Sequence, residues 1–330
     1  MKQLTNLTVT PKPGHLFENW QQAENWLTRM SLDGFEIYPN GSFNYEQVPK
    51  TLTGGFHLQS FPILTPLLYN DQKRLMHIFG DWNTVEQFYG GTDADFLVDT
   101  MVHQLNMAQD LGAPYAVFHP MDCDMDNIIT QDFPWQYQDT IKACATLLNQ
   151  ALAKSHFNGW LLLENMWWNK SFRLDNRNQY DELRLAINYD KCGICFDTGH
   201  LMATQPQLSN EPEAIKFIEN RLHKLDLYSE IITVHLNSSL LSQNYEPWEP
   251  DESDKAPFWQ QFDHALKHIN QLDPHQPFVQ TNLSHLIDSI SPDFVVHELS
   301  QCELVNWQNN IKHQILLMNI SEPEQSGQAA

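Results

Sequence analysis

The stretch WLLLEN at residues 160–165 is a short apolar run that ends on two polar residues, Glu164 and Asn165. The stretch GICFDTGH at residues 193–200 has the same plan and ends in an Asp-Thr-Gly-His word. Strands that are apolar on both faces belong to parallel sheets that are covered by helices. Six further runs repeat this plan: GFEIYP (34–39), GFHLQS (55–60), YAVFHP (115–120), IITVHLN (231–237), PFVQTN (277–282) and FVVHEL (294–299).

The segments between these runs have apolar residues at three- and four-residue steps, which predicts amphipathic helices. The clearest of them span 94–111, 137–153, 213–225, 258–272 and 304–318. Eight strands alternating with helices predict an α/β fold, a single-domain (β/α)8 TIM barrel over residues 1–318, with a disordered tail at 319–330. An open doubly wound sheet is the alternative, but its glycine-rich dinucleotide fingerprint is absent from the sequence. The acidic stretch 238–256 is either a surface loop or a substrate lid.

The charge and composition of the chain argue against nucleic acid and membranes as binding partners. The chain has 330 residues with 19 Lys+Arg and 41 Asp+Glu, a formal net charge of −22. Such a charge repels nucleic acid and anionic membranes, and no basic run offsets it. No segment approaches the roughly 18 apolar residues that cross a bilayer. The N-terminus lacks the apolar region of a secretory signal, and five cysteines in such a chain indicate reduced thiols and a cytoplasmic location. Cys192 and Cys195 have the spacing of a redox pair, but their apolar setting favours buried structural thiols.

Residues of the metal-binding types lie at or near the ends of six of the apolar runs. Burying Asp, Glu or His at such a position is costly unless each is paired or bound to a cation. Parallel strands bring all their carboxyl ends to one rim of a barrel, so these side chains are expected to lie together. They are His57, His119, Glu164, Asp197, His235 and Glu298. Mixed carboxylate and imidazole ligands suit Mn, Zn, Fe or Co better than Mg.

The sequence resembles the xylose isomerase-like TIM barrel family, which includes endonuclease IV and many sugar isomerases and epimerases. The similar words are LLLEN at 161–165, CFDTGH at 195–200 and VHLN at 234–237, with FHP at 118–120 and GFH at 55–57. In the isomerase branch, the resemblance implies one divalent metal held by Glu164, Asp197, His235 and a final Glu. It also implies that His200 contacts the substrate, and that Glu164 and the final Glu serve as acid and base.

Two points of this resemblance stay open in the sequence. The final Glu is Glu298 if FVVHEL is the last strand, whereas Gln280 would take its place if PFVQTN is. In the endonuclease IV branch, His57 and His119 would hold a second metal that Glu164 bridges. That branch also needs an Asp-x-His pair for a third metal, and the stretch 238–262 contains no His. The sequence therefore predicts one firmly held metal and a weak second one at most, with no third.

The leading functional hypothesis is a divalent-metal-dependent isomerase or epimerase of a small sugar, polyol or hydroxy-carbonyl compound. In it Glu164 and Glu298 would move the proton beside a metal-polarised carbonyl. Glu36 would orient the substrate or form an ion pair, and Trp167 would stack on the substrate or pack within its loop. The rivals are an endonuclease IV-like phosphodiesterase and a multinuclear iron oxidative enzyme. The expected partner is a small molecule, with neither nucleic acid nor membrane. The sequence does not decide whether the chain forms a homo-oligomer.

Overall fold

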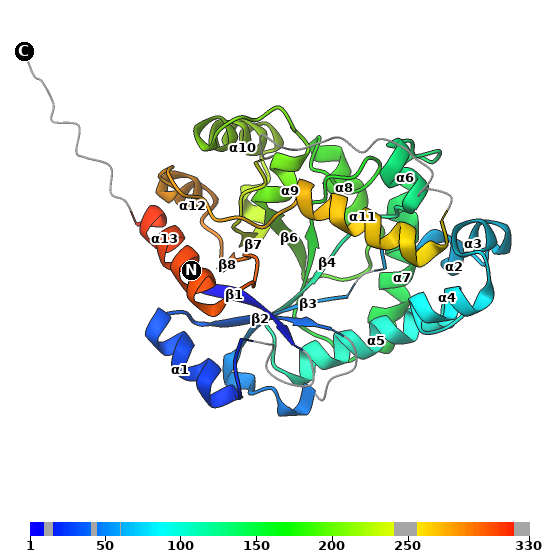
Figure 1. The fold of residues 1–330 in the computed structure, drawn as a ribbon, viewed down its shortest axis with the longest axis horizontal. Helices are drawn as coiled ribbons and strands as arrows, with labels where there is room; N and C mark the ends of the chain where they lie inside the picture. Colours follow the sequence, from blue (N-terminus) through cyan, green and yellow to red (C-terminus); the bar gives the residue numbers. More distant parts are fainter. Residues whose placement is uncertain (10–15, 41–44, 60, 241–255, 320–330) are drawn as a thin grey trace, which may run out of the picture.

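Eight parallel strands close into one barrel, so the predicted (β/α)8 fold is confirmed. The computed structural model describes residues 1–9, 16–40, 45–59, 61–240 and 256–319. Each strand pairs with its neighbours in sequence, and β1 closes the barrel on β8, as Figure 1 shows. The strands are β1 Lys2–Val9, β2 Gly34–Pro39, β3 Thr53–His57, β4 Tyr115–Phe118, β5 Trp160–Glu164, β6 Cys192–Asp197, β7 Ile231–His235 and β8 Phe294–His297.

The five helices predicted from apolar spacing are confirmed, with bounds that differ by at most two residues. They are α5 Ala94–Asp110, α7 Tyr137–Lys154, α10 Glu211–Leu225, α11 Phe258–Leu272 and α13 Leu304–Met318. The other helices are α1 Trp20–Met30, α2 Thr65–Leu68, α3 Gln72–Phe79, α4 Trp82–Tyr89, α6 Met125–Thr130, α8 Arg177–Ala186, α9 Thr198–Ala203 and α12 Ser284–Ile290. Local chemistry sets their ends. The Asp93 side chain caps α5 by accepting from the backbone N–H of Phe96, and Gly112, at φ 74°, follows its last turn.

One of the eight predicted strands is wrong, and the true first strand is β1. The segment KQLTNLTV has only a few apolar residues, but Leu4, Leu7 and Val9 are all buried. Its polar residues are satisfied within the barrel: Thr5, for example, donates to the backbone carbonyl of His297. The strand therefore lacks the continuous apolar run by which the other seven were recognised.

The run PFVQTN at 277–282 is not a strand, because a side chain and not a sheet satisfies its backbone. The N–H groups of Val279, Gln280 and Thr281 donate to the carboxylate of Glu211 at 2.6–2.9 Å. Gln280 itself is exposed. The last strand is thus β8, and Glu298 follows it directly.

Two apolar layers support the barrel. The interior is filled by Leu4, Tyr115, Val117, Leu162, Cys195 and Val296, and the larger layer lies between strands and helices. At the right of Figure 1, α2, α3 and α4 form an outlying group, and α11 runs towards it. Phe258 of α11 packs its ring against Phe79 and Phe88, which anchors α11 to that group.

Some expectations fall outside the described residues. The predicted lid at 238–256 is covered only at its ends, and the predicted tail at 319–330 only at Asn319. Among the described residues, no helix combines the length and the apolar composition that crossing a membrane requires.

We predict that one of the five thiols reacts rapidly in the native protein. Cys123, Cys144, Cys192 and Cys195 are buried and burial raises their pKa, whereas Cys302 is exposed. The thiolate is the reactive form, so the four buried cysteines should be inert. Titration with a chromogenic disulfide reagent should give one fast equivalent, and five after denaturation. Fast reaction of two or more thiols in the native protein would contradict this packing.

Candidate metal centre

The carboxyl ends of the strands bring together the ligand set that the sequence predicted. Glu164, Asp197, His235 and Glu298 each offer a ligand atom, and these four atoms lie within 4.8 Å of one another. All four side chains are buried. Gln280, the alternative to Glu298, is not part of this group.

Glu164, the last residue of β5, is the centre of the cluster. Its Oε2 lies 3.2 Å from His57 Nε2, 3.1 Å from His119 Nε2 and 3.5 Å from His235 Nδ1. Its Oε1 lies 3.0 Å from His200 Nδ1. The side chain has 0 % exposure, so a buried carboxylate is surrounded by imidazoles from four other strand ends.

Three further groups of ligand types adjoin or overlap the first. His57 and His119 form one with Glu164, Cys195 forms another with Glu164 and His235, and His200 forms the last with Asp273 and His275. Asp273-Pro274-His275 is an Asp-x-His pair that the sequence analysis missed. It follows α11, beyond the His-free stretch 238–262 on which the absence of a third metal was predicted.

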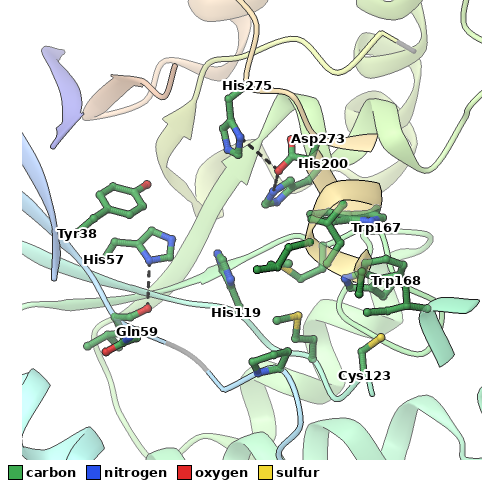
Figure 2. Close-up of a pocket in the computed structure, with 18 of the residues that line it drawn as sticks. Tyr38, His57, Gln59, His119, Cys123, Trp167, Trp168, His200, Asp273 and His275 are labelled. Carbon is green, nitrogen blue, oxygen red and sulfur yellow. Dashed lines mark hydrogen bonds and ion pairs between the residues drawn. The ribbon is translucent and has the colours of Figure 1, made fainter. Parts of the chain in front are cut away.

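The chain returns to the rim after α11 through a backbone bridge. Ser238, three residues after β7, pairs with Gln276 in an antiparallel bridge. The N–H of Ser238 donates to the carbonyl of Gln276 at 2.7 Å, and the N–H of Gln276 donates to the carbonyl of Ser238 at 3.2 Å. Asp273 ends α11 and accepts from the Ser239 hydroxyl at 2.9 Å. This bridge places His275 beside the strand ends although 40 residues separate it from His235. Figure 2 shows His57, His119, His200 and His275 around the same space.

Three imidazoles each place one ring nitrogen beside a carboxylate. A carbonyl oxygen can only accept, so His57 Nδ1, 3.1 Å from the Leu58 carbonyl, is a donor. Its other nitrogen lies 3.2 Å from Glu164 Oε2, where it could donate a proton to the carboxylate or share a bound cation with it. His200 repeats this arrangement, with Nδ1 at 2.9 Å from the Asn165 carbonyl and Nε2 at 3.2 Å from Asp273 Oδ2.

His235 is the third such imidazole. Its Nε2 lies 3.0 Å from Glu36 Oε1, while its buried Nδ1 has no hydrogen-bond partner among the described residues and lies 3.0 Å from Glu298 Oε2. A proton or a metal ion between these two atoms would relieve the repulsion of their lone pairs. Ligands about 2.1 Å from one Zn²⁺ at near-tetrahedral or right angles stand roughly 3.0–3.4 Å apart. The donor set therefore fits divalent metal ions.

The negative charge of the buried carboxylates also favours a bound cation. Burial, and then the carboxylates of Glu298 and Glu164, raise the pKa of Asp197 well above its usual range, although His200 opposes this. A fully buried carboxylate that is destabilised by its neighbours gains most from a bound cation. The site thus combines costly negative charge with imidazole nitrogens that lie beside the carboxylates.

The Asp-Thr-Gly-His word has a structural role for each residue. Asp197 caps α9 by accepting from the N–H of His200, and the Thr198 hydroxyl donates to the Asn237 carbonyl at 2.6 Å. A Cβ at Gly199 would lie 1.8 Å from Asn237 Oδ1, so only glycine allows this approach. Asn237 in turn donates to Asp197 Oδ2 at 2.7 Å. The word holds Asp197 and His200 in fixed positions.

Glu36 lies beneath the cluster and contacts His235. It accepts from the Tyr115 hydroxyl at 2.5 Å and is fully buried, away from the cavity. This position suits the ion-pair alternative, in which Glu36 orients a metal ligand. Tyr38, two residues further on the same strand, was missed by the sequence analysis; its hydroxyl donates to Glu298 Oε1 at 2.7 Å. The period-two spacing from Glu36 was the available signal.

A cavity of ≈ 380 Å³ opens over the cluster. His57, His119, His200, Glu298 and Trp167 line it, as do Tyr38, Asp273 and His275. Glu164, Asp197 and His235 are not among the lining residues and lie below its floor. The ring of Trp167 is 4.6 Å from that of His200, so this residue forms the wall next to the centre.

Comparisons with known proteins agree with the architecture. The model of the family described as xylose isomerase-like TIM barrel matches residues 88–272. A curated relative, "Probable endonuclease 4" of Mesomycoplasma hyopneumoniae (strain 7448), is 29 % identical over 147 residues, 44 % of this chain and 48 % of the relative. The chain thus spans about half the length of that relative.

Two solved structures share the fold. Endonuclease IV from Thermus thermophilus has a TM-score of 0.52 at 14 % identity, covering 96 % of this chain and 99 % of that one. A sugar phosphate isomerase/epimerase from Parabacteroides distasonis ATCC 8503 has a TM-score of 0.50 at 10 % identity, covering 96 % and 94 %. At these identities the two likenesses show the fold alone, and they do not separate the hydrolytic from the isomerising branch.

We predict that Glu36→Gln weakens metal binding by about 10–100-fold while the fold persists. Outer partners of metal-bound imidazoles have effects of this size, and the neutral amide polarises His235 less than the carboxylate does. Competition with a chromogenic chelator measures the affinity, and a thermal melt reports the fold. Asp288→Asn, the equivalent change at an exposed position, is the control. Equal affinities in Glu36→Gln and the parent would show that Glu36 does not act through His235.

Proposed function

The chain belongs to the xylose isomerase-like TIM barrel family, whose members are enzymes, and on that premise we propose that it hydrolyses a phosphoester of a small molecule at a multinuclear divalent-metal centre. The observation that supports this best is the position of Glu164. Both of its oxygens contact imidazoles that belong to different ligand groups. A carboxylate in that position would bridge metal ions held by the neighbouring ligand groups.

The same position disfavours Glu164 as the base of an isomerase. A base must reach the proton that it removes, yet Glu164 is fully buried and is absent from the cavity wall. Burial opposes its ionisation, but His119 and His235 outweigh burial and hold its pKa well below the usual range. The two-base mechanism therefore loses one of its two partners.

The candidate ligands fall into three sets. His57, His119 and Glu164 would hold one ion; Glu164, Asp197, His235 and Glu298 would hold a second; His200, Asp273 and His275 would hold a third. Bound divalent ions would supply Lewis-acid charge and lower the pKa of a coordinated water. Four carboxylates and five neutral imidazoles with three such ions leave about two net positive charges, which suits an anionic substrate.

Other residues of the chain complete the site. The Tyr38 hydroxyl holds one oxygen of Glu298 and orients that carboxylate at the cavity floor. Burial, and then Glu298, raise the pKa of Tyr38, which keeps the hydroxyl protonated as a donor. Trp167 and Trp168 exclude water from the wall beside His200.

Small substrates are favoured over DNA. The name of the curated relative suggests phosphodiester chemistry, but DNA-binding proteins hold phosphates with Lys and Arg. Neither residue type is among the described residues that line the cavity. The net charge of −22 adds a general repulsion of nucleic acid.

We predict that the protein, loaded with Zn²⁺ or Mn²⁺ and desalted, retains near three metal equivalents by elemental analysis. His119→Ala and His275→Ala should each lose about one, because the two residues belong to different ligand sets. His156→Ala removes a partly exposed imidazole outside the centre and should lose none. One equivalent in the parent, unchanged in both ligand variants, would refute the multinuclear centre and restore the isomerase hypothesis.

We predict that the metal-loaded protein hydrolyses bis(p-nitrophenyl) phosphate and that a chelator abolishes this activity. The same preparation should not bind an abasic DNA duplex with sub-micromolar affinity at about 0.15 M salt, because phosphate contacts from basic residues are missing. Release of p-nitrophenol and a filter-binding assay measure the two properties. Tight duplex binding would point to DNA as the substrate, and metal-loaded protein inert toward the aryl ester would argue against hydrolysis.

A further inference from the structure

We propose that the substrate is a small amphiphile, with an anionic head at the metal centre and an apolar body in the cavity beneath α11. This inference rests on the proposed function and names the substrate class of that same site. It is drawn from the cavity wall, which has two different halves. One half is the ligand cluster with its charged and polar groups, and the other is almost entirely apolar.

The apolar half is built from three segments that lie far apart in the sequence. The stretch between β4 and α6 contributes Met121 and Met125, and the stretch after β5 contributes Trp167 and Trp168. Helix α11 contributes a stripe at helical spacing: Phe262, Ala265, Leu266 and Ile269. Methionines adapt their shape to a bound apolar group, and indole rings offer large flat contacts. Figure 2 shows Trp167 and Trp168 on the opposite side of the space from Tyr38 and His57.

This half of the wall offers little to a sugar or polyol. Apart from the ligand cluster and Tyr38, the polar groups among the described lining residues are the exposed side chain of Gln59 and the indole N–H groups of Trp167 and Trp168. The N–H of Trp167 is buried without a hydrogen-bond partner in the described part of the chain and could bind one oxygen of a substrate. Sugar hydroxyls buried against Met, Trp and Leu would lose their hydrogen bonds to water without replacement, which costs free energy for each group. The polar body of a sugar therefore does not match the cavity.

The nearby basic group is also unable to hold a second anion. Arg74 lies outside the lining and pairs with Asp122 at 3.6 Å and Asp124 at 2.9 Å, with its guanidinium over the Trp135 ring. The described wall thus holds neither Lys nor Arg, and positive charge would come from the bound metal and the histidines around it. A single anionic head is expected, and the rest of the substrate is uncharged.

The mouth of the cavity leaves apolar surface uncovered. Leu266 is 40 % exposed although it lies on the cavity-facing stripe of α11, next to the buried Ala265. A bound apolar body would cover this side chain. The volume of ≈ 380 Å³ is near the lower end of the roughly 300–1,000 Å³ of small-molecule sites, which limits the body to one ring or a short chain.

The test is calorimetric titration of the metal-loaded protein with a series of alkylphosphonates, from methyl through butyl to hexyl, and with phenylphosphonate. Each buried CH₂ should tighten binding by about fourfold until the cavity is full. Glycerol 3-phosphate, a polar ligand of similar size to butylphosphonate, should bind no tighter than methylphosphonate. Elemental analysis of the same samples records the metal content.

Two variants of α11 make the test specific to its cavity-facing stripe. Leu266→Glu should remove most of the gain with chain length, because a carboxylate then replaces apolar surface at the mouth. Gln260→Glu adds the same charge at an exposed position of the same helix and should keep the parent's gain. A melt of each variant shows that it is folded.

The outcomes separate the two proposals. Equal affinity for all phosphonates, with metal present, overturns the amphiphile and leaves the metal-dependent hydrolase standing. Equal gains with chain length in the parent and in Leu266→Glu also overturn it, because the apolar body would then lie elsewhere. Protein that holds no metal and binds no phosphonate refutes the proposed function, and the amphiphile with it.

Discussion

The buried carboxylate of Glu164 is the constraint on which the rim of this barrel depends. A carboxylate without solvent is unfavourable unless positive charge or hydrogen-bond donors surround it. The fold meets this need by aligning the ends of β3, β4, β6 and β7 so that imidazoles approach both oxygens. Asn165, the next residue, exchanges two hydrogen bonds with the backbone of Asp197 and locks β5 to β6 at the level of the cluster.

Hydrogen bonds from residues around the cluster fix the orientation of its side chains. Glu36 and Tyr115 fix one side of His235, and Tyr38 fixes Glu298. Helix α11 connects the centre to the cavity, because its apolar stripe lines the wall and its final cap is Asp273. Changes in the packing of α11 are therefore expected to affect both substrate contact and the ligand set of His200.

The sequence predicted the barrel and the four residues that lie together at its rim because each depends on a local pattern. Seven strands are continuous apolar runs, and metal-ligand types of residue at or near the ends of six of them marked the rim. The first strand was missed because it lacks a continuous apolar run. Its polar side chains are satisfied by hydrogen bonds within the barrel, such as that of Thr5. The run at 277–282 was wrongly predicted as a strand because of its apolar residues. Its backbone N–H groups donate to the carboxylate of Glu211, which is distant in sequence, and not to a neighbouring strand.

The third ligand set depended on tertiary structure. Asp273 and His275 follow a helix and return to the rim through the bridge between Ser238 and Gln276, a pairing that no local pattern announces. The position of Glu164 beneath the cavity floor was equally invisible in the sequence, and it changes the functional interpretation. Under the proposed function, the residue that the resemblance implies as a catalytic base would instead be a bridging ligand.

The central claim, that Glu164 bridges metal ions, is tested most directly by anomalous X-ray diffraction from crystals of the metal-loaded protein at the absorption edge of the metal. The account predicts peaks on both sides of the Glu164 carboxylate, one within ligand distance of His57 and His119 and one within ligand distance of His235. It also predicts a further peak at His200, Asp273 and His275. A single peak among Glu164, Asp197, His235 and Glu298, with no density at the other two sets, would contradict it.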